Sequence, residues 1–237
     1  MKNCRNIPEE ARYESYEMST GTARLRAAAT GGSGAGQQAT RYARNAPAAP
    51  RPQGVHRHAG RSARDAYQKP HEVITALNLK PGEVIADIGA GSGYFTFRLA
   101  HHVGEAGRVY AVDVSPDMIV HLNRRLRDLQ VKNVVTILAA PDDPLLADAS
   151  IDRFFICDTW HHIDNHAHYL GLMKKMLKPG GQVVMIEFKK AQTPVGPPME
   201  MRIDRGDLLK EMEANGFKLT AEHTFLPHQY FLVFSVK

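Results

Sequence analysis

The stretch Val84-Ile85-Ala86-Asp87-Ile88-Gly89-Ala90-Gly91-Ser92-Gly93-Tyr94 decides the fold of this chain. Its first half is a short apolar run that ends at a glycine turn, which is typical of a buried parallel strand. Three glycines at alternate positions follow, and because they lack side chains, backbone amides and a helix N-terminus can face a ligand there. The stretch therefore predicts a strand, a ligand-binding turn and a helix in succession.

The chain beyond this stretch alternates strand and helix patterns. Short apolar runs predict strands, and apolar residues three or four apart predict helices. The expected strands are Glu83–Ile88, Arg108–Asp113, Asn133–Leu138, Arg153–Asp158, Gly181–Phe188, Lys218–Phe225 and Tyr230–Val236. The expected helices are Tyr94–Val103, Ser115–Leu126, His166–Leu177 and Asp204–Asn215. This order predicts an α/β fold with a Rossmann-like, doubly wound sheet of about seven strands, mostly parallel, that ends in an antiparallel hairpin.

The first 64 residues have a different composition. No Asp or Glu occurs from Met18 to Arg64, and apolar side chains are scarce there. Such a segment cannot bury enough apolar surface to offset its ordering entropy, so we expect a disordered N-terminal tail over 1–64 and one domain over 65–237. The Arg-rich, acid-poor character also resembles an organelle transit peptide, and a start codon assigned too early is a further alternative.

The basic net charge of +5 belongs to this tail. Residues 1–70 contain 12 Lys/Arg and 5 Asp/Glu, a net of +7, whereas the other 167 contain 18 and 20, a net of −2. We therefore expect no specific nucleic-acid partner. Cys4 and Cys157 do not form a disulfide framework, and no apolar run approaches the roughly 20 residues of a membrane span. These features favour a cytoplasmic protein, or an organelle protein if the tail is a transit peptide. The sequence carries no signal for an oligomeric state.

An acid follows the glycine turn at the spacing of a nucleoside site. Asp113 ends the second expected strand about 20 residues later, where a carboxylate accepts hydrogen bonds from ribose hydroxyls. A dinucleotide fingerprint, G-x-G-x-x-G, would require glycine in place of Tyr94, and D-x-G-x-G-x-G stands here instead. An NAD-type oxidoreductase is therefore the weaker alternative. Asp87 is suited to an ammonium group of the ligand, or it caps the turn.

These residues resemble the first two motifs of class I S-adenosylmethionine-dependent methyltransferases. Asp148–Asp152 and Leu177–Gly181 also resemble segments that precede the fourth and fifth strands of that superfamily. The similarity covers about residues 70–237 and is greatest to the small-molecule branch that contains ubiquinone/menaquinone C-methyltransferases. It implies S-adenosyl-L-methionine as the cofactor. The residues that we expect to bind the cofactor are Asp87, Gly89, Gly91, Gly93, Asp113, Val114, Asp142 and Asp158.

Asp142 marks a departure from that branch. An acidic residue after the third strand usually contacts the adenine amino group, but Ala140 and Pro141 align there, and proline has no amide hydrogen to donate. We interpret Asp142 as the substitute contact, and a solvated turn residue is the alternative.

Two clusters at strand ends are expected to flank the transferred methyl group, because ligands of open α/β sheets bind at the carboxyl edge. The first cluster is Asp158-Thr159-Trp160-His161-His162, and the second is Glu187-Phe188-Lys189-Lys190. Either histidine can act as a general base near neutral pH, with His162 the preferred candidate, or one of them packs at the next helix. The two lysines attract an anionic acceptor or belong to a solvated loop.

A metal site is not expected. His161, His162, His166 and His168 are close in sequence, but no Cys or acid is placed for a typical site.

The segment 193–202 is interpreted as a lid over the acceptor, with Met199 and Met201 as adaptable apolar surface, or else as a rigid linker. The resulting hypothesis is methyl transfer to a small-molecule acceptor by in-line displacement. A protein or nucleic-acid acceptor and a non-enzymatic cofactor-binding module are the alternatives.

Overall fold

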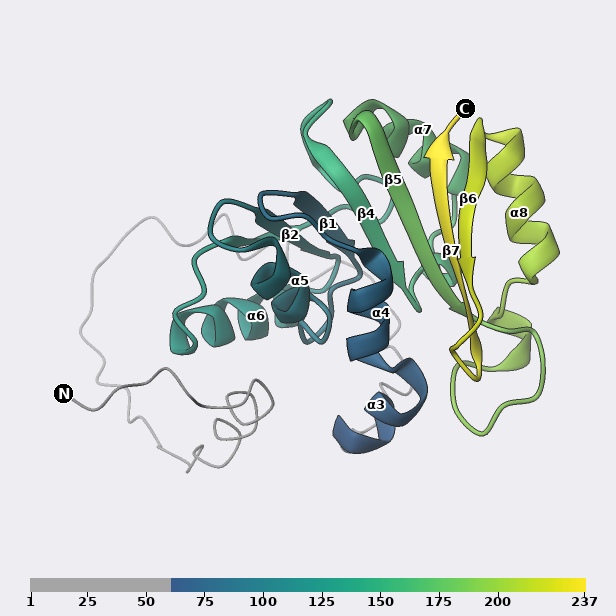
Figure 1. Cartoon of the computed structure of the whole chain (residues 1–237), viewed down its shortest axis with the longest axis horizontal. Helices are drawn as coiled ribbons and strands as arrows, with labels where there is room; N and C mark the ends of the chain where they lie inside the picture. The colour runs from purple at the N-terminus through teal and green to yellow at the C-terminus, as the bar shows by residue number, and fades with distance from the viewer. Residues whose placement is uncertain (1–60) are drawn as a thin grey trace, which may run out of the picture. The chain divides into compact units, whose positions relative to one another are not determined.

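A computed structural model describes residues 61–237, which form one seven-stranded sheet in the order β3-β2-β1-β4-β5-β7-β6 (Figure 1). The strands are β1 (Val84–Ile88), β2 (Arg108–Asp113), β3 (Val134–Leu138), β4 (Ile151–Cys157), β5 (Leu177–Phe188), β6 (Phe217–His223) and β7 (Gln229–Val236). Neighbours among β1 to β5 are parallel, and β7 is antiparallel to both β5 and β6. The predicted fold class, including the terminal hairpin, is confirmed.

Helices cover both faces of this sheet. They are α3 (Arg61–Gln68), α4 (Pro70–Leu77), α5 (Thr96–Val103), α6 (Pro116–Asp128), α7 (His166–Met176) and α8 (Arg205–Ala214), with short 3-10 turns η1 (Trp160–His162) and η2 (Met199–Met201). On β4, Phe154 and Ile156 share a core with residues of α7 and α8. Phe155 points to the other face, where its ring lies 4.9 Å from that of Phe95, just before α5. Successive strand residues face opposite sides, so α5 and α7 lie on different faces of the sheet.

Several expected boundaries differ from the structure by a few residues, and two of these differences have a clear local reason. The first helix begins at Thr96, not at Tyr94, because Gly93 N donates to Ala90 O and extends the turn. The fifth strand begins at Leu177, not at Gly181, because the pairing of β4 with β5 is irregular here. Leu177 pairs with Ile151, the next pair is Arg153 with Gln182, and the intervening Lys-Pro-Gly-Gly residues form a bulge within the strand.

Helix α3 lies at the carboxyl edge of the sheet. Gln68 Nε2 donates to Cys157 Sγ at 3.2 Å, and Tyr94 Oη donates to the Asp65 carboxylate. These contacts join α3 to the end of β4 and to the residue that follows the glycine turn. The helix begins at Arg61, four residues before the expected domain boundary.

The predictions for residues 1–60, namely the disordered tail, the transit peptide and the role of Cys4, lie outside the described residues. Across 61–237, no helix combines the length and apolar character that crossing a membrane requires.

Candidate active site

The glycine turn between β1 and α5 has left-handed backbone at all three glycines. Their φ angles are +73° at Gly89, +54° at Gly91 and +84° at Gly93. A Cβ atom at Gly89 would lie 2.3 Å from the Thr159 side chain, and one at Gly93 would lie 2.5 Å from Phe97. At Gly91 the nearest such neighbour is the Gly89 carbonyl oxygen, at 3.9 Å. Two of the glycines are thus needed for packing, while the face at Gly91 is open to a ligand.

Asp113 is fixed beside this turn at the end of β2. Its Oδ2 accepts a hydrogen bond from Gly91 N, and its Oδ1 accepts one from Ser115 N, both at 2.8 Å. The next residue, Val114, is 57% exposed. Asp142 is exposed in the turn that follows β3. The structure therefore brings Asp113 to the glycine turn and leaves Asp142 as a surface residue.

Asp87, the last acid before the turn, is buried. Its Oδ2 accepts a hydrogen bond from Thr96 Oγ1 at 2.6 Å. Burial raises the pKa of Asp87 to about 7, which the Thr96 hydrogen bond partly opposes and the Asp113 charge reinforces. A cation beside this carboxylate would favour its ionised form.

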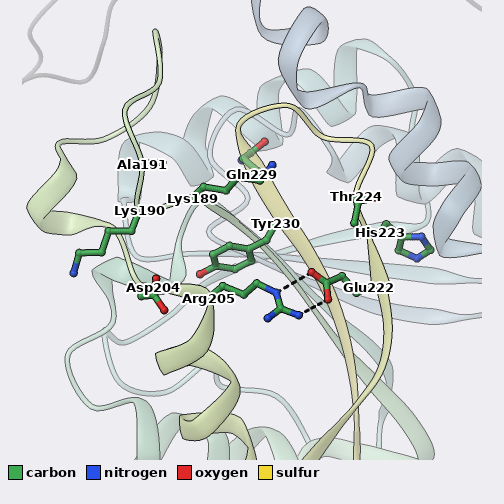
Figure 2. A pocket seen from close by; sticks show the side chains of 10 residues that line it. All are labelled: Lys189, Lys190, Ala191, Asp204, Arg205, Glu222, His223, Thr224, Gln229 and Tyr230. Carbon is green, nitrogen blue, oxygen red and sulfur yellow. Dashed lines mark hydrogen bonds and ion pairs between the residues drawn. The ribbon is translucent and has the colours of Figure 1, made fainter.

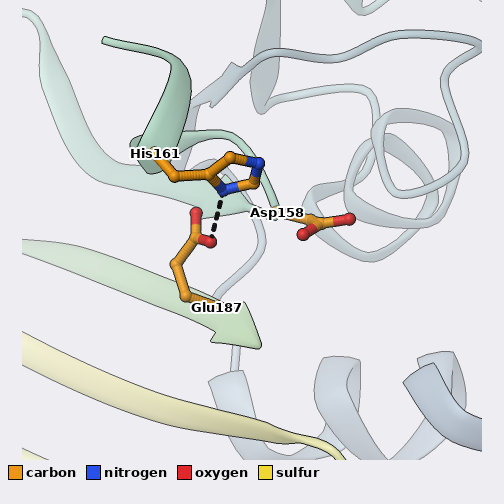
Figure 3. A group of neighbouring side chains, drawn as sticks. All are labelled: Asp158, His161 and Glu187. Atoms are coloured by element: carbon orange, nitrogen blue, oxygen red, sulfur yellow. Dashed lines mark hydrogen bonds and ion pairs between the residues drawn. The ribbon is translucent and has the colours of Figure 1, made fainter. Parts of the chain in front are cut away.

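The side chains of His161 and Glu187 form a buried pair at the carboxyl edge (Figure 3). His161 Nδ1 lies 2.8 Å from Glu187 Oε2. The other carboxylate oxygen, Oε1, accepts from Thr159 N at 2.8 Å and from Trp160 N at 2.6 Å. Burial alone would lower the pKa of His161, but the hydrogen bond and charge of Glu187, with the charge of Asp158, raise it overall. Because Glu187 accepts from Nδ1–H, the Nε2 atom is left free to take a proton.

Asp158 completes the group in Figure 3. It has a left-handed φ of +56°, and its N–H donates to Ile186 O at 2.8 Å. Burial first and the Glu187 charge second raise the pKa of Asp158 to about 6, against the charges of His161, Arg64 and Arg202. Single ligand atoms of Asp158, His161 and Glu187 lie within 4.8 Å of one another. The expectation that no acid accompanies these histidines was therefore wrong, although both Glu187 oxygens already accept N–H donors of the chain.

The other histidines of the motif occupy different surroundings. His162 is an exposed residue beside His161, and the partial burial of its ring together with the His161 charge lowers its pKa. His166 Nδ1 contacts Glu211 Oε1 at 2.6 Å, and its ring stacks on Trp160. The four histidines of the sequence cluster therefore do not converge on one point, and His166 has a structural role.

The segment between β5 and α8 is held by Arg202, which is 7% exposed. Its guanidinium group donates to four carbonyl oxygens of the same segment and packs over the Phe188 ring at 5.3 Å. The accepting residues are Lys189, Ala191, Val195 and Pro197. Met199 and Met201, expected to face an acceptor, are 40% and 37% exposed. The segment is therefore an ordered loop whose methionines face solvent in this conformation.

The lysines expected to attract an acceptor differ in the structure. Both lysines are exposed, and Lys189 Nζ in addition donates to Leu226 O and Pro227 O in the β6–β7 turn. The sequence placed Glu187 in the second cluster without a specific role, and it did not single out Arg202. A signal existed for Glu187, because it is the one acid in the otherwise apolar run Val183–Phe188.

Comparisons with known proteins agree with this geometry. A family described as a methyltransferase domain matches residues 79–224. The ubiquinone/menaquinone biosynthesis C-methyltransferase of Shewanella baltica is 30% identical over 120 residues, which are 50% of this chain and 48% of the relative. A demethylmenaquinone methyltransferase of Bacillus cereus is 28% identical over 116 residues, 49% of each protein. The matched region thus spans about half the length of these curated relatives.

A solved structure extends the likeness to most of the domain. The crystal structure of an S-adenosylmethionine-dependent methyltransferase from Aquifex aeolicus superposes with a TM-score of 0.71 at 25% identity, covering 74% of this chain and 93% of that one. The predicted superfamily and cofactor are therefore confirmed. The chain belongs to the methyltransferase domain family, within the class I S-adenosylmethionine-dependent methyltransferases.

Proposed function

We propose that this protein transfers a methyl group from S-adenosylmethionine to a small-molecule acceptor, with His161 as the general base and Glu187 as its positioning residue. The observation that carries the proposal is the hydrogen bond between His161 Nδ1 and the buried Glu187 carboxylate, beside the open glycine turn.

The residues at the turn fit the cofactor. The open face at Gly91 admits a nucleoside, and Asp113 is oriented by two backbone amides for ribose hydroxyls. The buried Asp87 suits the ammonium group of the methionine end, because a cation there would favour the ionised carboxylate and offset the burial that raises its pKa. When bound, S-adenosylmethionine supplies an electrophilic methyl group on a sulfonium, so the protein has to orient the acceptor, exclude water and remove a proton.

The pair formed by His161 and Glu187 suits the last of these tasks. Glu187 holds the ring in the tautomer with an unprotonated Nε2, and its charge stabilises the cation that forms when Nε2 takes the acceptor proton. Two backbone N–H groups fix Glu187 in turn. The structure thus favours His161 over His162, the preferred candidate from sequence, because His162 is exposed and its pKa is lowered.

Two observations support a small acceptor. The curated relatives are named for C-methylation in ubiquinone/menaquinone biosynthesis and for demethylmenaquinone. In the described part of the chain, the connection from β5 to α8 is a loop with the short turn η2, and it contains no further folded unit.

The test is transfer of a labelled methyl group. The full chain would be incubated with S-adenosylmethionine labelled in the methyl group and with a bacterial extract separated into small-molecule, protein and nucleic-acid fractions. Demethylmenaquinone would be assayed as a defined probe. We expect label in the small-molecule fraction and its loss in His161→Ala. Label confined to protein or nucleic acid would contradict the proposed acceptor class, and no label in any fraction would contradict methyl transfer itself.

A further inference from the structure

The buried side chains of residues 61–237 leave five nitrogen or oxygen atoms without a hydrogen-bond partner. Two of the five belong to Glu83 and Arg153, which form an ion pair with each other at 3.2 Å through other atoms. The remaining three are Asp158 Oδ1 and both amide atoms of Gln229. An unpaired buried amide is costly and rare in folded proteins, so these atoms call for a functional explanation.

Gln229 and Asp158 share the edge of the sheet that carries the active site. Gln229 is the first residue of β7, is 0% exposed and pairs with Phe188, the last residue of β5. The Phe188 ring in turn lies 5.9 Å from the ring of Tyr67 on α3. Asp158 follows β4 at the same edge and donates its N–H to β5. The three unpaired atoms therefore belong to two residues at the carboxyl edge of the parallel strands.

A cavity of about 250 Å³ reaches Gln229 at this edge (Figure 2). It lies between the segment that follows β5 and the β6–β7 hairpin. Figure 2 shows the Gln229 amide beside the hairpin turn, apart from the ion pair between Arg205 and Glu222 at the other end. The volume is several times the roughly 30 Å³ share of one water molecule in the liquid, so the cavity has room for part of an organic molecule.

We propose that Gln229 is a specificity-determining residue that binds the polar end of the methyl acceptor. Its Nε2 donates to a carbonyl oxygen of the acceptor, and its Oε1 accepts from an adjacent hydroxyl or N–H group. A methyl-accepting molecule that carries a hydrogen-bond donor next to a carbonyl oxygen satisfies both unpaired amide atoms at once. Asp158 Oδ1 accepts a second hydroxyl. The substrate class is thus a small molecule with a hydroxyl or N–H beside a carbonyl, and this assignment rests on the proposed methyl transfer.

The chain offers a matched control in a second buried glutamine. Gln68 is 1% exposed, and both of its amide atoms are paired, Oε1 with Arg64 Nε at 2.6 Å and Nε2 with Cys157 Sγ. Gln229→Met and Gln68→Met both replace an amide with an apolar side chain of similar length. If the Gln229 amide is unpaired in the free protein, Gln229→Met should raise the Tm by about 2–4 °C, whereas Gln68→Met should lower it.

The functional half of the test measures cofactor affinity and methyl transfer in the full chain. Gln229→Met should leave the affinity for S-adenosylhomocysteine unchanged, while transfer from labelled S-adenosylmethionine to the small-molecule fraction of the extract falls by at least about tenfold. Gln229→Leu serves as a second apolar variant if the Met variant does not fold.

Three results would overturn the proposal. A fall in Tm for Gln229→Met like that of Gln68→Met would show that the amide has a structural partner. Unchanged transfer would show that it does not bind the acceptor. Absence of transfer by the unsubstituted protein would refute the proposed function, and the Gln229 assignment with it. Transfer that occurs in the unsubstituted protein and is unchanged in the Gln229 variants would refute the Gln229 assignment alone.

Discussion

Asp113 is the residue on which we expect cofactor affinity to depend most directly. Its two oxygens are oriented by Gly91 N and Ser115 N, so the carboxylate is preorganised before any ligand arrives. A charge-assisted hydrogen bond contributes about 1.5–3 kcal/mol, so Asp113→Ala should weaken binding of S-adenosylmethionine by roughly 10- to 150-fold. Calorimetry would measure the affinity. Asp117→Ala, an exposed acid on the next helix, is the control and should bind normally; equal affinity in both variants would show that the ribose contact is assigned wrongly.

The pair of His161 and Glu187 makes a prediction about pH. A general base works only when neutral, so activity should rise with pH as His161 deprotonates. Because the pKa of His161 is raised, this rising limb of the pH–rate profile should lie at higher pH than for an ordinary histidine. Glu187→Gln removes the charge that raises the pKa and leaves the burial that lowers it. The limb should therefore move to lower pH, while the rate falls by about 10²-fold or more because the tautomer is no longer held.

Rate profiles against pH for the two proteins would measure this shift. His162→Ala is the control and should keep the limb where it is in the unsubstituted protein. A pH–rate profile that shifts in His162→Ala but not in Glu187→Gln would show that His162, and not His161, is the general base.

Helix α3 is the element whose role the structure changed most. Composition placed the domain boundary at residue 65, yet Asp65 and Gln68 bond to Tyr94 and Cys157 from a helix that begins at Arg61. A chain that begins at Arg61 should match the full chain in Tm and in cofactor affinity. A chain that begins at Lys69 loses about two hydrogen bonds and should melt roughly 4–8 °C lower, with weaker binding. Thermal melts and calorimetry of the three chains would decide, and equal values for all three would show that α3 is dispensable.

The loop between β5 and α8 depends on one buried arginine. Arg202→Met would leave four carbonyl oxygens without their donor, so the loop should loosen and its backbone should become accessible to a protease at Lys189 and Lys190, whose side chains are already exposed. Trypsin should then cleave there several-fold faster, as mass spectrometry of the fragments would show. Arg205→Met, which removes an exposed ion pair of small expected energy, should leave cleavage unchanged. Similar cleavage in both variants would mean that Arg202 does not hold the loop.

At the scale of the whole molecule, ligand selectivity follows from the glycine pattern and the family assignment. A ligand at 100 times its Kd stabilises the folded state by about 2.7 kcal/mol, which corresponds to a rise in Tm of roughly 5–11 °C for a domain of this size. S-adenosylhomocysteine should produce this rise and NAD should not. Melting curves with each ligand would test it, and a rise with NAD alone would revive the oxidoreductase alternative.

The sequence by itself determined the class of fold and the identity of the cofactor. Alternating strand and helix patterns, the glycine turn and Asp113 are local signals, and each depends on residues within about one βα unit. The bulge that extends β5 to Leu177 escaped prediction because it depends on how that strand pairs with β4.

Only the tertiary structure decided which side chains act together at the edge. Thr159, His161 and Glu187 come from two strand ends separated by a helix, and their pairing depends on the register of β4 with β5. The two histidines look equivalent in the sequence but differ in burial, since the His161 side chain is enclosed beside an acid and His162 is exposed. The unpaired amide of Gln229 has no sequence signal either, because whether a polar atom finds a partner depends on every element packed around it.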